Sequence, residues 1–294
     1  MNGQPLRYLS LFSGIGGFDL GFDRAGMVCA GQVEFDEKAR EVLAKHWPDV
    51  PRLNDVREVN GDEFGSIDLI CGGFPCQPHS LAGKRRGSDD ERDLWGEFFR
   101  IVCAVKPRWI VAENVFGLLS SENGRFFGSI LRDLAGIGYD AEWEVLPASL
   151  FGAPHKRERV FLIAYPSGIT GERRIFFNGF DDIPRNKQWS TTKGIKSGRG
   201  WKRWLIEASS HLDGEISQSD FLGVDDGVSE EMDRIKTLGN AVVPQIAEWI
   251  GRRINELDAA QAPEFVNAHN TEVGQAVAIR AKNHTVLQSV FAAV

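Results

Sequence analysis

The chain of 294 residues is 42% hydrophobic and 26% charged, with a formal net charge of −7. These values are ordinary for a soluble globular protein with an ample core, and they exclude a protein coated in basic surface. No apolar run approaches the length of a membrane span, and the four cysteines form neither a CxxC pair nor a zinc-type cluster. We therefore expect a cytoplasmic protein with reduced thiols, no bound metal and no membrane contact.

In chain order, the first 165 residues alternate strand and helix patterns. Strand patterns cover residues 6–12, 27–33, 67–71, 109–112, 139–146 and 160–164, and a further strand is expected just before Asp55. Helical patterns cover residues 17–24, 37–46, 94–105 and 126–136. This alternation predicts an α/β fold with a mostly parallel sheet and helices on both faces. The last two strands are joined by a short stretch without a helical pattern, so we expect them to pair antiparallel at one edge.

The composition changes after Tyr165. Residues 166–210 hold nine Lys and Arg residues against four acidic ones, with tryptophans and the Phe176–Phe177 pair interleaved. Residues 211–233 reverse the sign of the charge, and a helical pattern returns only at residues 244–257. We predict a catalytic and cofactor-binding domain over 1–165, a small irregular domain over 166–235, a return to the first domain over 236–257, and an appendage over 258–294.

A glycine-rich turn follows the first predicted strand and opens the first helix. It is formed by Phe12, Ser13, Gly14, Ile15, Gly16 and Gly17. Backbone N–H groups of such a turn can face a ligand with no side chain in the way. The turn does not complete GxGxxG, because Asp19 stands at the last glycine position, which counts against a nicotinamide dehydrogenase.

Two acidic positions end the next two strands. Glu34 lies 20 residues past Gly14, where a carboxylate can accept the ribose hydroxyls of an adenosine. Phe35 can then cover one face of an adenine, and Asp55 with Val56 can meet its edge. The pattern predicts an adenosine site at this end of the sheet.

Cys76 follows Pro75 on the loop after the strand at residues 67–71, at the carboxyl end where chemistry collects in open α/β sheets. A cysteine placed there is a candidate nucleophile. Glu113 ends the next strand and is placed for acid or hydrogen-bond work. Arg157 and Arg159 alternate on an extended segment, so they share a face that suits an anion.

These motifs, in this order, resemble those of the DNA (cytosine-5) methyltransferases of bacterial and phage restriction–modification systems. The matching stretches are the glycine turn, Glu34, Asp55, residues 73–77 (Gly-Phe-Pro-Cys-Gln), residues 113–115 (Glu-Asn-Val), residues 157–159 and residues 239–244 (Gly-Asn-Ala-Val-Val-Pro). Together they span residues 8–254. The sequence departs from the family at His155, where Gln is usual, and at Ala241, where Ser is common.

The resemblance implies S-adenosylmethionine as cofactor, held in a Rossmann-like fold. It adds Pro75, Leu94, Asn240 and Ala241 to the cofactor-binding residues named above. It implies that Cys76 attacks carbon-6 of a flipped-out cytosine in double-stranded DNA, that Glu113 holds the ring, and that Arg157 and Arg159 orient the base. No metal is required.

The same resemblance makes residues 166–235 a target-recognition domain. The expected DNA contacts are Gln77, Ser80, Lys193, Lys196, Arg199 and Lys202. We expect a monomer, and a cognate restriction endonuclease is a further candidate partner.

Two other functions remain open from the sequence. An RNA (tRNA) cytosine-5 methyltransferase shares the core, but the Cys-Phe-Thr signature usual for that group is missing here. A non-catalytic DNA-binding protein on the same scaffold is the other alternative, and the intact Cys76, Glu113, Arg157 and Arg159 argue against it.

Overall fold

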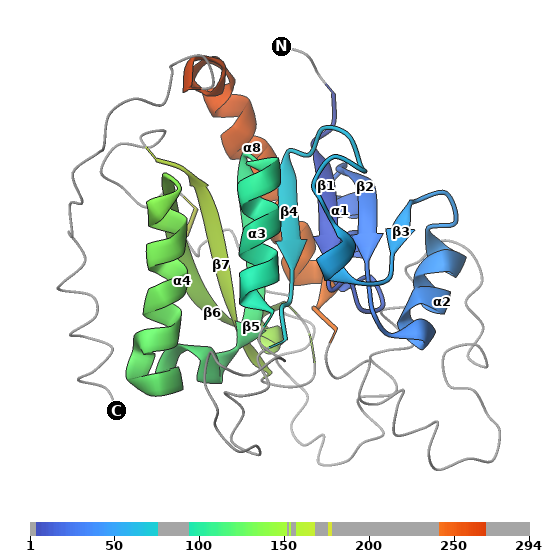
Figure 1. Cartoon of the computed structure of the whole chain (residues 1–294), viewed down its shortest axis with the longest axis horizontal. Helices are drawn as coiled ribbons and strands as arrows, with labels where there is room; N and C mark the ends of the chain where they lie inside the picture. The colour runs from blue at the N-terminus through green and yellow to red at the C-terminus, as the bar shows by residue number, and fades with distance from the viewer. Residues whose placement is uncertain are drawn as a thin grey trace. The chain divides into compact units, whose positions relative to one another are not determined.

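The computed structural model describes residues 4–75, 94–151, 153, 157–167, 176–177 and 241–268, and for 261–268 the backbone alone (Figure 1). The chain divides into two units, Met1–Ala260 and Gln261–Val294. Apart from the backbone of residues 261–268, the features described below lie in the first unit.

Seven strands form one sheet in the order β3-β2-β1-β4-β5-β7-β6. The strands are β1 (Arg7–Leu11), β2 (Val28–Val33), β3 (Arg52–Leu53), β4 (Leu69–Gly72), β5 (Trp109–Val115), β6 (Tyr139–Pro147) and β7 (Glu158–Pro166). Strands β1 to β5 are parallel to one another. Strand β7 runs antiparallel to both β5 and β6. The predicted mostly parallel sheet with an antiparallel edge pair is therefore confirmed.

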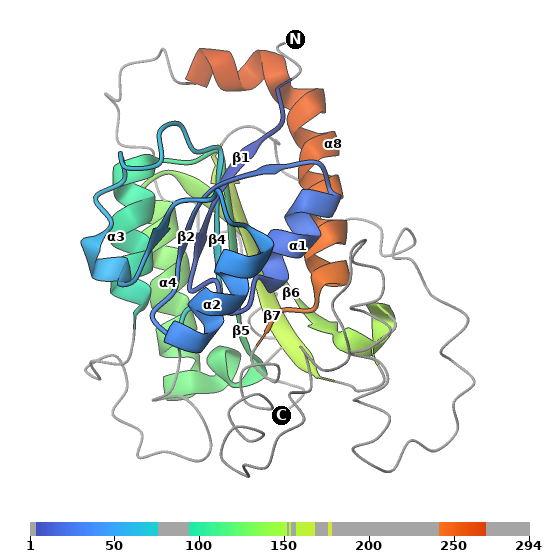
Figure 2. The ribbon, with the colours of Figure 1, turned by 90° about the vertical axis from the view of Figure 1, so that its right-hand side faces the viewer.

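Helices cover both faces of the sheet, as Figure 2 shows. Helices α3 (Trp95–Val105) and α4 (Arg125–Gly136) lie on one face, and α1 (Gly17–Arg24) and α8 (Pro244–Ala268) lie on the other. Helix α2 (Glu37–His46) lies near the β3 edge. Among the described helices, none is both long and apolar enough to cross a membrane.

The local sequence explains where several of these elements begin. Asp36 caps α2 by accepting a hydrogen bond from Ala39 N, which satisfies one of the free N–H groups of the first turn. The central strands β4 and β5 are covered on both faces, and this is why they read as continuous apolar runs. Gly21 lets α1 approach α8, because a Cβ at residue 21 would lie 2.4 Å from Ala247 Cβ.

The topology brings the predicted motifs to one edge of the sheet. The carboxyl ends of β1 to β5 point to this edge, because parallel strands end on the same side. Strand β7 runs the other way, so its amino end, with Arg157 just before it, lies at the same edge. Residues separated by more than 100 positions in the sequence are thus gathered beside one another.

The ends of β5 and α8 differ most from the sequence prediction. Strand β5 continues to Val115, so Glu113 lies inside the strand and not after it. Helix α8 continues past Leu257 to Ala268, and the division between the two units falls after Ala260. Asp258 belongs to the first unit, where its carboxylate accepts hydrogen bonds from Arg108 and Trp109.

Candidate functional site

The glycine turn after β1 has a backbone that only glycine adopts easily. Gly14 and Gly16 have φ of 55° and 87°, in the left-handed region. Trp47, which follows α2, packs directly on the turn, because a Cβ at Gly16 would lie 2.5 Å from Trp47 Cζ3. The Trp47 indole in turn donates to Asp23 Oδ2 at 2.6 Å. The turn is therefore shaped by its glycines and by an aromatic side chain that sequence analysis did not single out.

Glu34 joins the end of β2 to this turn. Its Oε2 accepts a hydrogen bond from Gly14 N at 2.6 Å, and its Oε1 accepts one from Asp36 N at 2.7 Å. Each carboxylate oxygen can accept a second bond, so Glu34 remains able to receive ribose hydroxyls. The next residue, Phe35, is 78% exposed, which leaves its ring open to a ligand.

A buried polar cluster lies beneath the turn. Asp19 of α1 is fully buried and accepts hydrogen bonds from Ser10 Oγ (3.0 Å) and Gln32 Nε2 (2.8 Å). Gln32 Oε1 in turn accepts a hydrogen bond from Arg52 Nε at 2.7 Å. Burial raises the pKa of Asp19 to about 6, although the hydrogen bonds from Gln32 and Ser10 oppose that rise. The cluster links β1, α1, β2 and β3 through side chains.

The last motif returns to the glycine turn, as the resemblance implies. The Val242 carbonyl packs against Gly17, since a Cβ at residue 17 would lie 2.3 Å from that oxygen. Arg157 Nη1 donates a hydrogen bond to the carbonyl of Ala241 at 2.6 Å. One end of the expected cofactor site and one of the expected catalytic arginines are thus joined through residues 241–242.

Glu113 lies near the end of β5 and is only 7% exposed. Its Oε2 faces Gly73 so closely that a Cβ there would lie 2.9 Å away. Arg159 Nε forms an ion pair with Oε1 at 3.0 Å, but without hydrogen-bond geometry, so Oε1 has no hydrogen-bond partner among the described residues. Beside this ion pair, a carboxyl oxygen can also accept a hydrogen bond from a ligand.

The charge on Glu113 is set by opposing effects. Burial raises the pKa of Glu113, and the guanidiniums of Arg159 and Arg157 lower it only in part. Burial together with the charge of Arg159 lowers the pKa of Arg157 to about 10. The two arginines therefore both act on Glu113, as their predicted common face implies.

Asn114 holds the backbone that leads to Cys76. Its Nδ2 donates to the Phe74 carbonyl at 2.9 Å, and its Oδ1 accepts from Val115 N at 2.8 Å. Phe74 itself is buried against Trp95 and Phe98 of α3. Asn114 is the middle residue of the Glu-Asn-Val motif. Its side chain fixes the course of the chain up to Pro75.

Several predicted residues lie outside the described part of the chain. They are Cys76, Gln77, Ser80, His155, Lys193, Lys196, Arg199, Lys202 and Asn240. The other predicted residues lie at the carboxyl edge of the sheet: the turn at 12–17, Glu34, Phe35, Asp55, Val56, Pro75, Glu113, Arg157, Arg159 and Ala241, with Leu94 as the N-cap of α3. Val56 is buried, so only its backbone can meet a ligand. The described residues contain no group of three or more potential metal ligands.

Phe176 and Phe177 lie within residues 166–235, the segment predicted to be the target-recognition domain. Both rings are buried against Trp249 of α8. Their backbone N–H groups donate to the carboxylate of Glu142, which also accepts a hydrogen bond from Tyr165. This pair anchors the chain to β6 and α8.

Comparison with known proteins now identifies the family. The profile of the family described as C-5 cytosine-specific DNA methylase matches residues 6–203. The chain belongs to this family. The match includes the glycine turn, Glu113 and both arginines, so the geometry described above is that of a C-5 cytosine methylase core.

Type II methyltransferases are among the curated relatives of this chain. M.HgiCII of Herpetosiphon aurantiacus is 36% identical over 186 residues, which is 59% of this chain and 43% of the relative. M.HhaI of Haemophilus parahaemolyticus is 35% identical over 177 residues, which is 60% of this chain and 54% of the relative. The matched region is thus about half the length of these relatives.

Solved structures share the fold. A crystal structure of a DNA modification methyltransferase encoded within an E. coli prophage superposes with a TM-score of 0.60 at 22% identity, covering 86% of this chain and 99% of that one. DNMT2 of Spodoptera frugiperda superposes with a TM-score of 0.56 at 17% identity over the same shares. At these identities the likeness supports the fold alone.

Proposed function

We propose that this protein transfers a methyl group from S-adenosylmethionine to carbon-5 of a flipped-out cytosine in double-stranded DNA. The observation that carries the proposal is the position of Glu113. It is a buried carboxyl group with a raised pKa, paired with Arg159, and it lies beside the strand end that leads to Cys76. A family match over residues 6–203 supports the same reaction.

The described residues fit S-adenosylmethionine in three ways. Gly17 leaves no room for a side chain beside Val242, so backbone lines the turn. Glu34 offers carboxylate oxygens at the end of β2, and exposed Phe35 offers a ring face. Bound S-adenosylmethionine supplies the methyl group as an electrophile next to this edge.

We propose that Cys76, as its thiolate, adds to carbon-6 of the cytosine and makes carbon-5 nucleophilic. Glu113 provides a proton at ring N3 while its second oxygen accepts from the exocyclic amine, which stabilises the charge that builds on the ring. Carbon-5 then takes the methyl group, and S-adenosylhomocysteine leaves. A base removes the proton from carbon-5, the bond between Cys76 and carbon-6 breaks to restore the thiolate, and the N3 proton returns to Glu113.

Arg159 and Arg157 have separate tasks in this proposal. Arg159 pairs with Glu113 and so holds the carboxyl group in the orientation that meets the base. Arg157 ties residue 241 to the site through its carbonyl. Both guanidiniums can donate to the cytosine carbonyl and the sugar-phosphate, and the two positive charges favour the thiolate of Cys76.

DNA contacts are proposed for Gln77, Ser80, Lys193, Lys196, Arg199 and Lys202. The support is the local excess of basic residues in an acidic protein, as expected where phosphates are neutralised. Replacing the last four together with Gln should lower DNA affinity and flatten its salt dependence, with cofactor affinity unchanged.

Methyl transfer from labelled S-adenosylmethionine tests the proposal. The purified protein is offered double-stranded DNA, tRNA or neither, and label is counted in nucleic acid. We expect incorporation into DNA, at cytosine, and none into tRNA. Label in tRNA alone would support the RNA alternative, and DNA binding without label would support a non-catalytic protein.

A further inference from the structure

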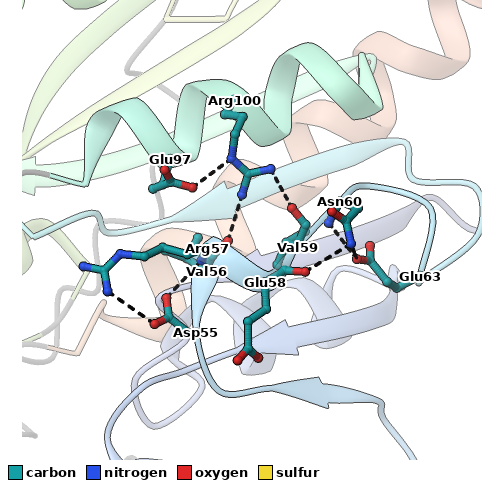
Figure 3. A network of polar contacts seen from close by, with 9 residues as sticks. All are labelled: Asp55, Val56, Arg57, Glu58, Val59, Asn60, Glu63, Glu97 and Arg100. Carbon is teal, nitrogen blue, oxygen red and sulfur yellow. Dashed lines mark hydrogen bonds and ion pairs between the residues drawn. The ribbon is translucent and has the colours of Figure 1, made fainter.

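Arg100 of α3 forms hydrogen bonds with the loop that follows β3. Its Nη1 donates to the Val59 carbonyl at 2.7 Å and its Nη2 donates to the Val56 carbonyl at 3.1 Å. Its Nε donates to Glu97 Oε2 at 2.8 Å, one turn earlier on the same helix (Figure 3). All three guanidinium nitrogens are thus engaged, and the planar group fixes the loop in direction as well as in distance.

The loop bound by Arg100 contains Asp55 and Val56. Residues Val56–Glu58 form a single 3₁₀ turn, and Asp55 caps it by accepting a hydrogen bond from Arg57 N at 3.0 Å. The side chains of Val56 and Val59 are buried, so packing of these side chains holds the turn together with the hydrogen bonds from Arg100. The position of the Asp55 carboxylate therefore depends on the position of this turn.

The same helix carries a second expected cofactor contact. Leu94 is the N-cap of α3, and its carbonyl accepts a hydrogen bond from Phe98 N at 3.1 Å. Because a helix is rigid over two turns, Arg100 sets the spacing between Leu94 and the Asp55 loop. Two parts of the adenosine site that are about 40 residues apart in the chain are linked by one side chain.

We infer that Arg100 is a positioning residue for adenine selectivity: by holding Asp55 and Val56 against α3, it keeps the Asp55 carboxylate where it accepts from the exocyclic amine of adenine. This inference rests on the proposed function. Hypoxanthine carries a carbonyl oxygen in place of that amine, so a well-placed carboxylate meets an acceptor and disfavours it. A carboxylate that is free to move discriminates less, because hydrogen bonds weaken steeply with poor geometry.

The test compares two ligands, S-adenosyl-L-homocysteine and S-inosyl-L-homocysteine, by calorimetry with no DNA present. The wild-type protein should prefer the adenosine compound by at least about 20-fold, because the inosine compound presents an acceptor to the Asp55 carboxylate. Arg100→Met should reduce that preference about fivefold or more, with affinity for the inosine compound changed less than about twofold. Arg100→Lys can still donate to a carbonyl, so its preference for the adenosine compound should lie between those of the wild type and Arg100→Met.

A matched control is Arg253→Met, which removes an arginine of α8 that also forms an ion pair three residues along its helix, with Glu256. It should leave the preference unchanged. If Arg100→Met keeps the wild-type preference, or loses affinity for both ligands equally, Arg100 is only a structural residue and the inference is wrong. If Arg100→Met does not fold, the same comparison with Arg100→Lys decides.

The wild-type affinities distinguish a failure of the proposed cofactor from a failure of the role of Arg100. A wild-type protein that binds neither ligand contradicts the proposed cofactor and, with it, the role of Arg100. A wild-type protein that binds and discriminates, beside an Arg100 variant with unchanged preference, contradicts the role of Arg100 alone.

Discussion

Glu113 carries two needs of the proposed reaction in one carboxyl group. Ring N3 of cytosine requires a proton donor, and the exocyclic amine requires an acceptor. A protonated carboxyl group supplies both, and burial raises the pKa of Glu113 in that direction despite Arg159 and Arg157. The side chain is placed to do so because Gly73 has no Cβ.

Glu113→Gln should lower kcat at least about 100-fold, because the amide keeps the shape but cannot deliver a proton. Cofactor affinity should remain within about twofold. In the wild type, kcat should fall as the pH rises through the raised pKa, because the proton is then lost; the variant should lack this limb. A kcat of the variant near the wild-type value would exclude Glu113 from the chemistry.

Asp19 makes a second pH-dependent contribution, this time to stability. Its pKa is about 6 in the folded protein, against 3.8 for an unburied aspartate. The folded state therefore binds more protons than the unfolded state between these pH values. The contribution of Asp19 to the free energy of unfolding is thus largest below about pH 4 and is lost as the pH rises to about 6. The loss from this one group is up to about 3 kcal/mol.

Asp19→Asn removes the titrating group while an amide can still bond to Ser10 and Gln32. Urea unfolding at several pH values between 4 and 7 should show a smaller decline in the free energy of unfolding for the variant than for the wild type. Curves with the same pH dependence in both proteins would show that Asp19 does not titrate in this range.

At the scale of elements, α1 and the chain at residues 241–242 meet with no space between them. Gly17→Ala would place a Cβ 2.3 Å from the Val242 carbonyl oxygen, so one of the two must move. We expect a loss of stability of about 1–3 kcal/mol and weaker cofactor binding, because the glycine turn moves with it.

The matched control is Gly96→Ala in α3, where a Cβ meets nothing within 4 Å. It should be neutral or stabilising by up to about 1 kcal/mol, since alanine favours a helix. Thermal unfolding and calorimetric binding of S-adenosyl-L-homocysteine measure both effects. Equal behaviour of the two variants would mean that the contact with Val242 is not made in solution.

The sequence predicted α1 and α2 with the bounds that the structure shows, because each has a clear start and a regular apolar face. It placed the end of β5 too early, because Glu113 and Asn114 interrupt the apolar run although both are buried and paired with β7. It ended α8 too early, because the partners of Asp258 are residues 108 and 109, about 150 positions away. Local patterns do not contain such contacts.

The same limit applies to the site. Motif order predicted which residues gather at the carboxyl edge, since topology alone decides that. It did not predict Trp47 on Gly16, Asn114 on the Phe74 carbonyl or Arg100 on the Asp55 loop. These supporting contacts are made by side chains from elements distant in the sequence, and their partners are backbone atoms that leave no signature in it.

At the scale of the whole molecule, Phe176 and Phe177 redefine where an exchangeable recognition segment begins. They are anchored by Glu142 and Trp249, so we expect the DNA-facing part to start after residue 177 and not at residue 166. Replacing residues 178–235 with those of a relative of different specificity should transfer that specificity to an active chimera.

Bisulfite sequencing of DNA modified by the chimera reads the methylated site directly. A chimera that also replaces residues 166–177 should be less stable, because it loses the buried aromatic pair. If an active chimera still methylates the parent's site, specificity lies outside residues 178–235.

Trapping of a covalent complex between the protein and DNA tests whether Cys76 attacks cytosine. DNA with 5-fluorocytosine at the target should form a covalent complex in the presence of S-adenosylmethionine, because fluorine cannot leave carbon-5 as a proton does. Peptide mapping should place the bond on Cys76, and Cys76→Ala should form no complex and transfer no methyl group while it still binds cofactor. Methyl transfer by Cys76→Ala at a near wild-type rate, or an adduct on another residue, would contradict the account.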